Sequence, residues 1–366
     1  MKIIISGGGT GGHIYPALSI AEALHRQRPD AEILFVGALG RMEMEKIPQA
    51  GYHITGLPVT GFDRRNPVKN IGTVINLLQS LRLARRTIKQ FRPDVVVGVG
   101  GYASGPTLKT AARMNIPTII QEQNSYPGIT NKLLAARATK ICVAYSGMEK
   151  YFPADKIIIT GNPVRQNITC TPEKRHEGYK HFGLDPDMKT ILITGGSLGA
   201  KTLNDSILHA LPALNDGSVQ FLWQSGKTNY HQSLQQLEQH NNLPIHLLEY
   251  INRIDLAYSV ADLIISRAGA VTISEISLTG KPLILVPSPN VAEDHQTKNA
   301  LALVSHNAAL LVPDPDALRD LIPLALQTVH NEDRLKELSA NISQFSHPAA
   351  ADRIVDEILK ITDRKQ

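Results

Sequence analysis

Three glycine-rich segments of this 366-residue chain could each hold a phosphate group. Each follows a short apolar run, and they are Gly7–His13, Gly98–Tyr102 and Gly195–Ala200. A strand that ends in glycines and leads into a helix presents backbone N–H groups and the positive end of the helix dipole to an anion. Glycine also serves tight turns for steric reasons alone, so one such loop is weak evidence. Three loops, two of which begin separate halves of the chain, predict a site for a phosphate-bearing substrate.

The first loop also fits the dinucleotide fingerprint G-x-G-x-x-G through Gly7, Gly9 and Gly12. An NAD-dependent dehydrogenase is therefore an alternative. That fingerprint normally needs an acidic residue at the end of the second strand, where it holds the ribose diol. Here the second predicted strand, Glu32–Val36, is followed by Gly37 and Ala38, and the first carboxylate after it belongs to Glu43. The missing carboxylate argues against the dinucleotide, and NADH binding would revive it.

Two side chains near these turns could act on a substrate. His13 follows the first loop, and imidazole titrates near neutrality, so it is a candidate general base. At the start of a helix, however, such a residue more often only bonds to the backbone. Glu275 follows the turn 267–270, where its carboxylate could accept hydrogen bonds from a ribose diol. The pattern Thr272-x-x-Glu275 also fits a capping box, which is a purely structural use of the same carboxylate.

Neither a metal site nor a disulfide framework is predicted. Cys142 and Cys170 lie far apart, without a CxxC pattern or a neighbouring histidine pair, which fits a reducing cytosol. The Asp-Pro-Asp triplets at 185–187 and 314–316 place proline in a turn, and we interpret them as loop or cap residues. A net charge of +5 suits an anionic substrate or a membrane surface, but it is too small to indicate nucleic-acid binding.

The elements that must position these residues alternate between short apolar runs and amphipathic stretches, which is typical of doubly wound parallel sheets. Polar clusters at 122–124 and 294–299 follow predicted strands, at the strand ends where open α/β sheets bind ligands. We predict an α/β fold of two Rossmann-like domains, residues 1–161 and 162–345, that face a cleft, with a C-terminal helix at about 346–366 that packs back on the first. The predicted strands are Lys2–Ser6, Glu32–Val36, Asp94–Val99, Pro117–Gln121, Lys140–Ala144, Thr190–Thr194, Val219–Gln224, Ile245–Leu248, Asp262–Ser266 and Pro282–Val286.

The stretch Val68–Gln90 has apolar residues at helical spacing followed by a basic end. Most helices of this kind simply cover a core, and contact with a membrane surface is the alternative. No apolar run is long enough to cross a bilayer. We therefore expect a soluble or at most peripheral protein.

Six motifs, taken in order, are specific enough to indicate a family. They are Gly8–His13, Gly100–Pro106, Glu122–Asn124, Gly161–Arg165, Gly195–Ser197 and Ser266–Glu275. With them the chain resembles, over essentially its whole length, the MurG family of bacterial UDP-N-acetylglucosamine transferases, which are GT-B glycosyltransferases of peptidoglycan synthesis. Gln121 and Leu198 depart from the residues that are frequent in the family, and the apolar stretch lacks the tryptophans of some members.

The resemblance implies that UDP-N-acetylglucosamine (UDP-GlcNAc) binds mainly to the second half of the chain. Ser197 would contact the diphosphate, the Ile251 backbone the uracil, and Glu275 the ribose hydroxyls. Arg165 would lie near the nucleotide, and Gln296 on the sugar. The remaining donor-binding residues would be Thr10, Gly11, Gly12, Asn124, Ala270, Val271, Thr272, Ile273 and Ser274.

The implied acceptor is lipid I, the undecaprenyl-diphosphate-linked MurNAc-pentapeptide. Its diphosphate would lie near Gly9, Gly100, Gly101 and Tyr102. The resemblance also implies a peripheral protein on the cytoplasmic face of the inner membrane, with a role in cell-wall synthesis, cell shape and cell division. Membrane contact would come from Ile71, Ile75, Leu78, Arg82, Arg85 and Arg86.

The implied reaction is an inverting displacement that converts lipid I to lipid II. The acceptor 4-hydroxyl attacks the anomeric carbon of GlcNAc while UDP leaves, and His13 is the candidate base. Helix N-termini and backbone N–H groups would stabilise the departing diphosphate, and no metal or cofactor is expected. Three alternatives stay open: a GT-B UDP-sugar transferase with another acceptor, the dehydrogenase, and a scaffold that binds nucleotide sugar without catalysis.

Overall fold

The computed structural model describes residues 1–61, 70–165, 168–196, 198–214, 217–240 and 243–363. The chain divides into two compact units. Unit 1 comprises Met1–Arg165 and His347–Gln366, and unit 2 comprises Gln166–Ser346. The division lies after Arg165, where we predicted it after residue 161. Within the part of the chain that the structure describes, no helix is both long and apolar enough to cross a membrane.

Unit 1 is built on a parallel sheet with the strand order β3-β2-β1-β4-β5-β6-β7. Its central strands are short apolar runs that are buried on both faces, as parallel sheets require. The strands are β1 (Lys2–Ser6), β2 (Glu32–Ala38), β3 (His53–Leu57), β4 (Val95–Gly98), β5 (Thr118–Glu122), β6 (Lys140–Val143) and β7 (Ile157–Ile159).

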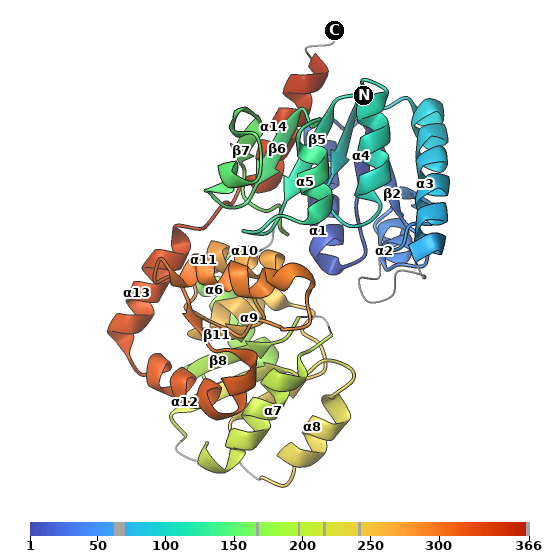
Figure 1. Cartoon of the computed structure of the whole chain (residues 1–366). Coiled ribbons are helices and arrows are strands. Elements are labelled where there is room, and N and C mark those ends of the chain that lie inside the picture. Colours follow the sequence, from blue (N-terminus) through green and yellow to red (C-terminus); the bar gives the residue numbers. More distant parts are fainter. Residues whose placement is uncertain (62–69, 166–167, 197, 215–216, 241–242, 364–366) are drawn as a thin grey trace. The chain divides into compact units, whose positions relative to one another are not determined.

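Helices cover both faces of this sheet (Figure 1). Ile3 and Ile5 of β1 pack in one core with α1 (Gly11–Gln27) and α14 (Ala350–Asp363). Ile4 points to the other face, where the core includes residues of α3, α4 and α5. The helices of this second layer are α3 (Asn70–Phe91), α4 (Ser104–Arg113) and α5 (Ile129–Ala135), and the short helix α2 (Glu43–Gln49) follows β2. Short 3-10 turns η2 (Met148–Lys150) and η3 (Ala154–Lys156) follow β6.

The C-terminal helix α14 belongs to unit 1. Its buried side chains Ile354, Val355 and Ile358 join the core beneath α1, and Asp352 pairs with Arg26 of α1 at 2.9 Å. The chain reaches α14 past Gly161, whose φ is +83° and where an added Cβ would lie 2.2 Å from the His347 Cβ. Glycine is therefore required at this crossing.

Unit 2 has a second parallel sheet, in the order β10-β9-β8-β11-β12-β13. Its strands are β8 (Lys189–Thr194), β9 (Val219–Gln224), β10 (Ile245–Leu248), β11 (Leu263–Ser266), β12 (Leu283–Leu285) and β13 (Leu310–Leu311). The helices are α6 (Pro172–Phe182), α7 (Lys201–Ala210), α8 (Tyr230–Leu237), α9 (Ile254–Val260), α10 (Ala270–Thr279), α11 (His295–Val304), α12 (Ala317–Val329) and α13 (Glu332–Ser343), with 3-10 turns η4 (Leu211–Ala213), η5 (Ala292–Asp294) and η6 (Asp314–Asp316). Trp223 is fully buried in the core that α7 and α12 share with the sheet.

Each sheet reverses its strand order beside its first strand, between β1 and β4 in unit 1 and between β8 and β11 in unit 2. Open α/β sheets bind ligands at the carboxyl ends of the strands at such reversals. The glycine loops follow β1, β4 and β8, and the turn before α10 follows β11. The predicted α/β fold with two doubly wound parallel sheets is confirmed, and the predicted loops lie at the points where such sheets bind ligands.

Candidate functional site

The first two glycine loops of unit 1 fit against each other. An added Cβ on Gly101, whose φ is +82°, would lie 2.3 Å from the carbonyl oxygen of Gly8. A Cβ on Gly7 would lie 2.2 Å from Val99 Cγ2. These separations are shorter than any real Cβ contact, so only glycine allows the two loops to approach this closely.

His13 lies in the first turn of α1, beside the second loop. Its ring Nδ1 is 3.3 Å from the Thr10 hydroxyl oxygen, and a Cβ on Gly100 would lie 2.8 Å from its Nε2. In the neutral tautomer that donates Nδ1–H to Thr10, Nε2 carries the lone pair that a general base needs. The ring is half-buried, whereas Thr10 and Gly12 are exposed and Gly11 is half-buried. The side chain therefore contacts Thr10, and its geometry is compatible with proton transfer.

Glu122 is a buried carboxylate that shapes the loop after β5. Its Oε1 accepts from the backbone N–H of Asn124 at 3.0 Å and from the Asn124 side-chain amide at 3.1 Å. Its Oε2 accepts from Gly128 N–H at 3.1 Å and from the Asn131 amide at 2.8 Å. Glu122 thus positions Asn124, which is the candidate donor-binding residue of this loop.

A chain of buried amides joins this loop to its neighbours. Gln123 Nε2 donates to Val99 O at 2.7 Å, and also to the side-chain oxygen of Gln121. Gln121 Nε2 donates to Asn162 Oδ1 at 3.0 Å, and Asn162 Nδ2 donates to Gln123 O at 3.0 Å. The second glycine loop, the end of β5 and the segment after β7 are therefore held as one hydrogen-bonded group. The sequence did not indicate this role for Gln121.

The acceptor candidates of unit 1 differ in their surroundings. Tyr102 is 51% exposed, Gly101 is half-buried and Gly100 is buried. The Gly9 N–H donates to Glu43 Oε2 at 2.8 Å, so this amide already has a carboxylate partner inside the protein. Arg165, a donor candidate, lies in unit 1 with its guanidinium carbon 4.9 Å from the centre of the Tyr15 ring.

In unit 2, Gln224 connects the third glycine loop to the segment that contains Ile251. Gln224 Nε2 donates to Gly196 O at 2.6 Å, and its Oε1 accepts from the Ile251 N–H at 3.1 Å. Ile251 itself is buried. An added Cβ on Gly199 would lie 2.0 Å from Ser225 O, which fixes the same loop against the end of β9. Ser197 lies outside the described residues.

Helix α10 follows β11, the strand that pairs with β8, and carries most of the remaining donor candidates. Its N-cap is Gly269, which offers no side-chain cap, so the first-turn N–H groups have the arrangement that binds anions. Ala270 and Ile273 are buried, and Val271, Thr272 and Ser274 are half-buried. This assignment of the N-cap makes the capping-box interpretation wrong, because Glu275 lies in the second turn of α10 and not three residues after the cap.

Glu275 is almost fully buried, and Tyr258 OH donates to its Oε2 at 3.4 Å. Gln296, at the start of α11, accepts from the Ser288 N–H at 2.8 Å. Sequence analysis assigned no role to Arg267, which donates to the carbonyl of Val286 at 3.1 Å and pairs with Asp314. The Asp-Pro-Asp turn at 314–316 therefore anchors the loop before α10.

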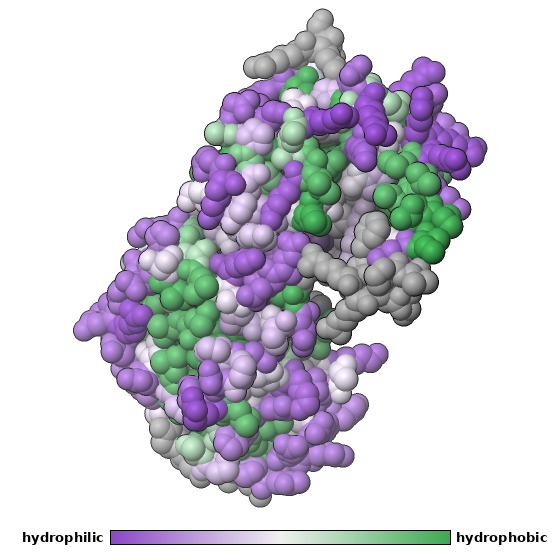
Figure 2. Space-filling view, viewed as in Figure 1, coloured by the Kyte–Doolittle hydropathy of each residue, from purple (hydrophilic) through white to green (hydrophobic). Residues whose placement is uncertain are grey.

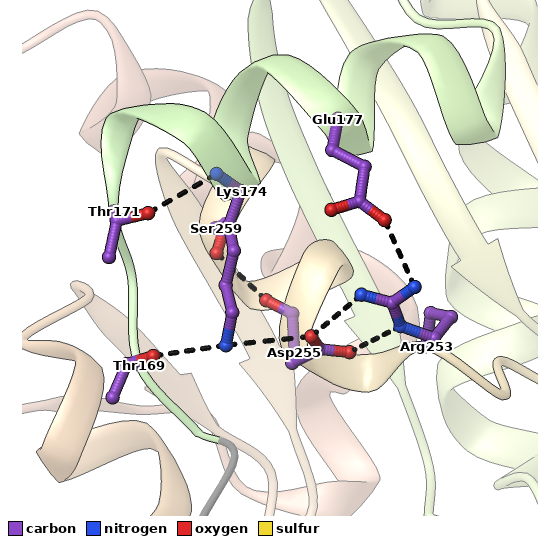
Figure 3. A network of polar contacts seen from close by, with 7 residues as sticks. All are labelled: Thr169, Thr171, Lys174, Glu177, Arg253, Asp255 and Ser259. Carbon is purple, nitrogen blue, oxygen red and sulfur yellow. Dashed lines mark hydrogen bonds and ion pairs between the residues drawn. The ribbon is translucent and has the colours of Figure 1, made fainter.

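The segment after Ile251 is fixed by a network of ion pairs (Figure 3). Arg253 donates to both carboxylate oxygens of Asp255, at 3.0 and 3.1 Å, and to Glu177 at 3.0 Å. Lys174 lies 3.6 Å from Asp255 and bonds to Thr169. Partial burial opposes ionisation of Asp255, but the bonds and charge of Arg253, together with the charge of Lys174, outweigh it and lower the pKa of this carboxyl. The network joins α6 to α9 and holds the segment that follows Ile251.

Helix α3 carries the candidate membrane contact. Ile71 is 65% exposed, Ile75 50% and Leu78 53%, and they form an apolar patch at the N-terminal end of the helix (Figure 2). Arg82, Arg85 and Arg86 are exposed on the following turns, and the helix contains no Asp or Glu. An amphipathic helix with cationic side chains beside its apolar face is suited to the interface of an anionic membrane.

Sequence comparison places both halves of the chain in one family. Residues 3–143 match the glycosyltransferase family 28 N-terminal domain, and residues 190–354 match the glycosyltransferase family 28 C-terminal domain. The chain is 58% identical, over all of its length and 99% of the relative, to the UDP-N-acetylglucosamine--N-acetylmuramyl-(pentapeptide) pyrophosphoryl-undecaprenol N-acetylglucosamine transferase of Parabacteroides distasonis. The protein of the same name from Bacteroides fragilis is 55% identical over all of this chain and 96% of the relative.

Solved structures give the same fold. The crystal structure of MurG from Acinetobacter baumannii aligns with a TM-score of 0.81 and 29% identity, over 98% of this chain and 99% of the other. UDP-GlcNAc 2-epimerase from Neisseria meningitidis, solved with UDP-GlcNAc, aligns with a TM-score of 0.69 over 98% of this chain and 100% of the other. Its 18% identity shows a shared fold alone.

Proposed function

The chain belongs to glycosyltransferase family 28, and from this membership we propose that it transfers GlcNAc from UDP-GlcNAc to the MurNAc unit of undecaprenyl-diphosphate-MurNAc-pentapeptide. The observation that carries the proposal is the full-length similarity to relatives that are named for this transfer. Two doubly wound sheets with glycine loops at their strand-order reversals support it, because they offer one anion-binding edge in each unit. The dehydrogenase alternative has no support from the family.

The donor is assigned to unit 2. The uncapped N-terminus of α10 and the third glycine loop would bind the diphosphate, and the segment at Ile251 would lie against the uracil. Glu275 would accept hydrogen bonds from the ribose hydroxyls, with Tyr258 holding its carboxylate from the inside. Gln296 would contact the sugar. These helix N-termini would also stabilise the negative charge that develops on UDP as it leaves.

The acceptor and the base are assigned to unit 1. The acceptor 4-hydroxyl forms a bond to the anomeric carbon of GlcNAc, the bond from that carbon to the UDP oxygen breaks, and the hydroxyl proton passes to His13 Nε2. Attack opposite the leaving group inverts the anomeric centre. Gly100, Gly101 and Tyr102 would lie near the acceptor diphosphate, beside the first turn of α1.

We further propose that the protein works at the cytoplasmic face of the inner membrane. Its acceptor carries a polyprenyl chain that stays in the bilayer, whereas its donor is dissolved in the cytosol. The exposed apolar end of α3 and the arginines that follow it are the parts of unit 1 assigned to membrane contact.

The test is release of UDP from UDP-GlcNAc by the purified protein, measured with and without the lipid-linked MurNAc acceptor. We expect release that depends on this acceptor. Release that requires another acceptor would indicate a different UDP-sugar transferase, and donor binding without release under any condition would indicate a nucleotide-sugar-binding scaffold.

A further inference from the structure

Glu43 is a buried carboxylate to which neither the sequence nor the proposed reaction assigns a role. It is the first residue of α2, and its side chain is 1% exposed. Its Oε1 accepts from the Ala38 N–H at 2.9 Å, and its Oε2 accepts from the Gly9 N–H at 2.8 Å. One carboxylate thus joins the end of β2 to the first glycine loop, through two charge-assisted hydrogen bonds.

Two glycines form the space that this carboxylate occupies. An added Cβ on Gly8 would lie 2.1 Å from Glu43 Oε1, and one on Gly37 would lie 2.6 Å from Glu43 Cγ. A side chain at either position would displace the carboxylate. The first glycine loop is therefore shaped around the Glu43 carboxylate. The Gly9 amide that binds this carboxylate is one that a dinucleotide-binding loop would offer to a phosphate.

The first glycine loop, which Glu43 holds, is connected to the candidate base His13 through the second loop. Gly8 is next to the amide that Glu43 binds, and it lies against Gly101 of the second loop. An added Cβ on Gly101 would lie 2.3 Å from the carbonyl oxygen of Gly8. Gly100, beside Gly101, lies against the His13 ring. Movement of the first loop away from Glu43 would alter the contact between the two loops and the position of His13.

We propose that Glu43 is a positioning residue for the transfer reaction: it closes the first glycine loop from inside and so holds His13 against the second loop. The inference rests on the proposed role of His13. Because the Gly9 N–H is committed to Glu43, the acceptor diphosphate is left to the second loop. Since the donor is assigned mainly to unit 2, Glu43 acts on turnover far more than on binding of the donor.

The test uses Glu43→Gln and Glu43→Asp, with Glu45→Gln as the matched control on the exposed side of the same helix, where Glu45 accepts from Gln49. Glutamine offers one oxygen acceptor for the two N–H donors, so at least one bond is lost. We expect kcat of Glu43→Gln to fall by about tenfold or more, with the KM for UDP-GlcNAc changed by less than about twofold. Glu43→Asp, which keeps the charge, should recover part of kcat, and Glu45→Gln should match the wild type.

Two readouts separate positioning from general support of the fold. In the His13→Ala background Glu43→Gln should cause little further loss, because both changes remove the same contribution. Amide hydrogen exchange at Gly9 and Ala38 should be faster in Glu43→Gln than in Glu45→Gln. Equal losses of kcat in both backgrounds, or a raised donor KM that accompanies a lower melting temperature, would overturn the proposal.

Failure of the proposed function has a different signature. In that case the wild type and Glu45→Gln would themselves show no acceptor-dependent release of UDP. Amide hydrogen exchange at Gly9 would still be faster in Glu43→Gln than in Glu45→Gln, because the bond to Glu43 does not depend on the reaction. If Glu43→Gln does not fold, Glu43→Asp carries the same comparison. Wild-type kcat in both Glu43 variants would remove Glu43 from the reaction.

Discussion

At the scale of single residues, buried carboxylates and amides determine where the candidate groups lie. Glu122 uses four hydrogen bonds to fix the loop of Asn124, and Gln224 fixes both the third glycine loop and Ile251. Each such group would be costly to bury without its partners, so these bonds restrict the backbone to one arrangement. The groups assigned to substrate are held by neighbours to which no substrate contact is assigned.

His13→Ala tests the candidate base. Loss of a general base typically lowers turnover by about 10²–10⁴-fold. We expect a fall in kcat within this range and a nearly unchanged dissociation constant for UDP-GlcNAc, measured by calorimetry. Near-normal turnover would remove His13 from this role.

Glu275→Gln tests the contact with the ribose. The amide keeps the size of the side chain, but it loses the charge that strengthens hydrogen bonds from hydroxyl groups. We expect the KM for UDP-GlcNAc to rise by about tenfold, which corresponds to about 1.4 kcal/mol, with kcat changed less. A lower melting temperature at unchanged donor affinity would instead assign Glu275 to the packing of α10 against Tyr258.

At the scale of elements, the close approach of loops and the return of α14 depend on a few backbone positions. Gly101 and Gly161 both have positive φ, and both face atoms that leave no room for a side chain. The strand reversals bring their loops together, and these glycines allow the final approach. Substitution of either glycine should therefore disturb the packing of a whole loop or helix.

Gly101→Ala and Gly105→Ala form a matched pair in the second loop and α4. A Cβ at Gly105 would be 3.5 Å from Thr130 Cγ2, an ordinary contact, whereas at Gly101 it would overlap Gly8 O. A non-glycine residue in the left-handed region costs about 1–3 kcal/mol before any overlap is counted. Urea denaturation should show a loss of at least this size for Gly101→Ala and none for Gly105→Ala. Equal stability of the two variants would show that the loops can separate at no cost.

The attachment of α14 should depend on pH through His347. Burial, together with the nearby positive charge of Arg353, lowers the pKa of His347 below its ordinary 6.5. Just below that value the unfolded chain therefore takes up a proton that the folded chain does not, and the free energy of unfolding falls as the pH drops from 7 to 5. In urea denaturation His347→Gln should show a smaller fall over this range. An identical pH dependence in the two proteins would contradict this account.

Membrane contact is a property of one helix and can be tested by replacing one side chain. Ile75→Glu adds a charge to the exposed apolar end of α3, whereas Leu318→Glu makes the same change at a 48% exposed leucine of unit 2. In sedimentation with vesicles that contain anionic lipid, we expect Ile75→Glu to lower the bound fraction and Leu318→Glu to leave it unchanged. Equal binding by both variants would place the contact elsewhere.

At the scale of the whole molecule, the alternation of apolar runs was enough to predict both sheets. The three strands that it missed, β3, β7 and β13, all lie at sheet edges, where they are short and only partly buried. The β3 sequence, His-Ile-Thr-Gly-Leu, lacks the apolar run that marks a central strand, whereas the apolar runs of β7 and β13 span only three and two residues. The prediction of elements therefore failed at edge strands whose apolar run is short or interrupted, whereas the edge strand β10, which has four residues, was predicted.

The sequence could identify the loops but not the groups that hold them. Glu43 was noted only as too late to be a dinucleotide carboxylate, and its bond to Gly9 depends on the distance between two segments that the sequence does not give. The same holds for Arg267 and Asp314, which are 47 positions apart. Long-range pairs of this kind become visible only when the strand order is known.

The most direct test of the proposed transfer is the structure of its product. Purified protein is incubated with UDP-GlcNAc and the lipid-linked MurNAc-pentapeptide, and the lipid product is analysed by mass spectrometry and NMR. The account predicts one added GlcNAc per acceptor, joined to the 4-hydroxyl of MurNAc with the anomeric configuration inverted from α to β. Release of UDP without a new lipid product, or a product with the α configuration, would contradict it.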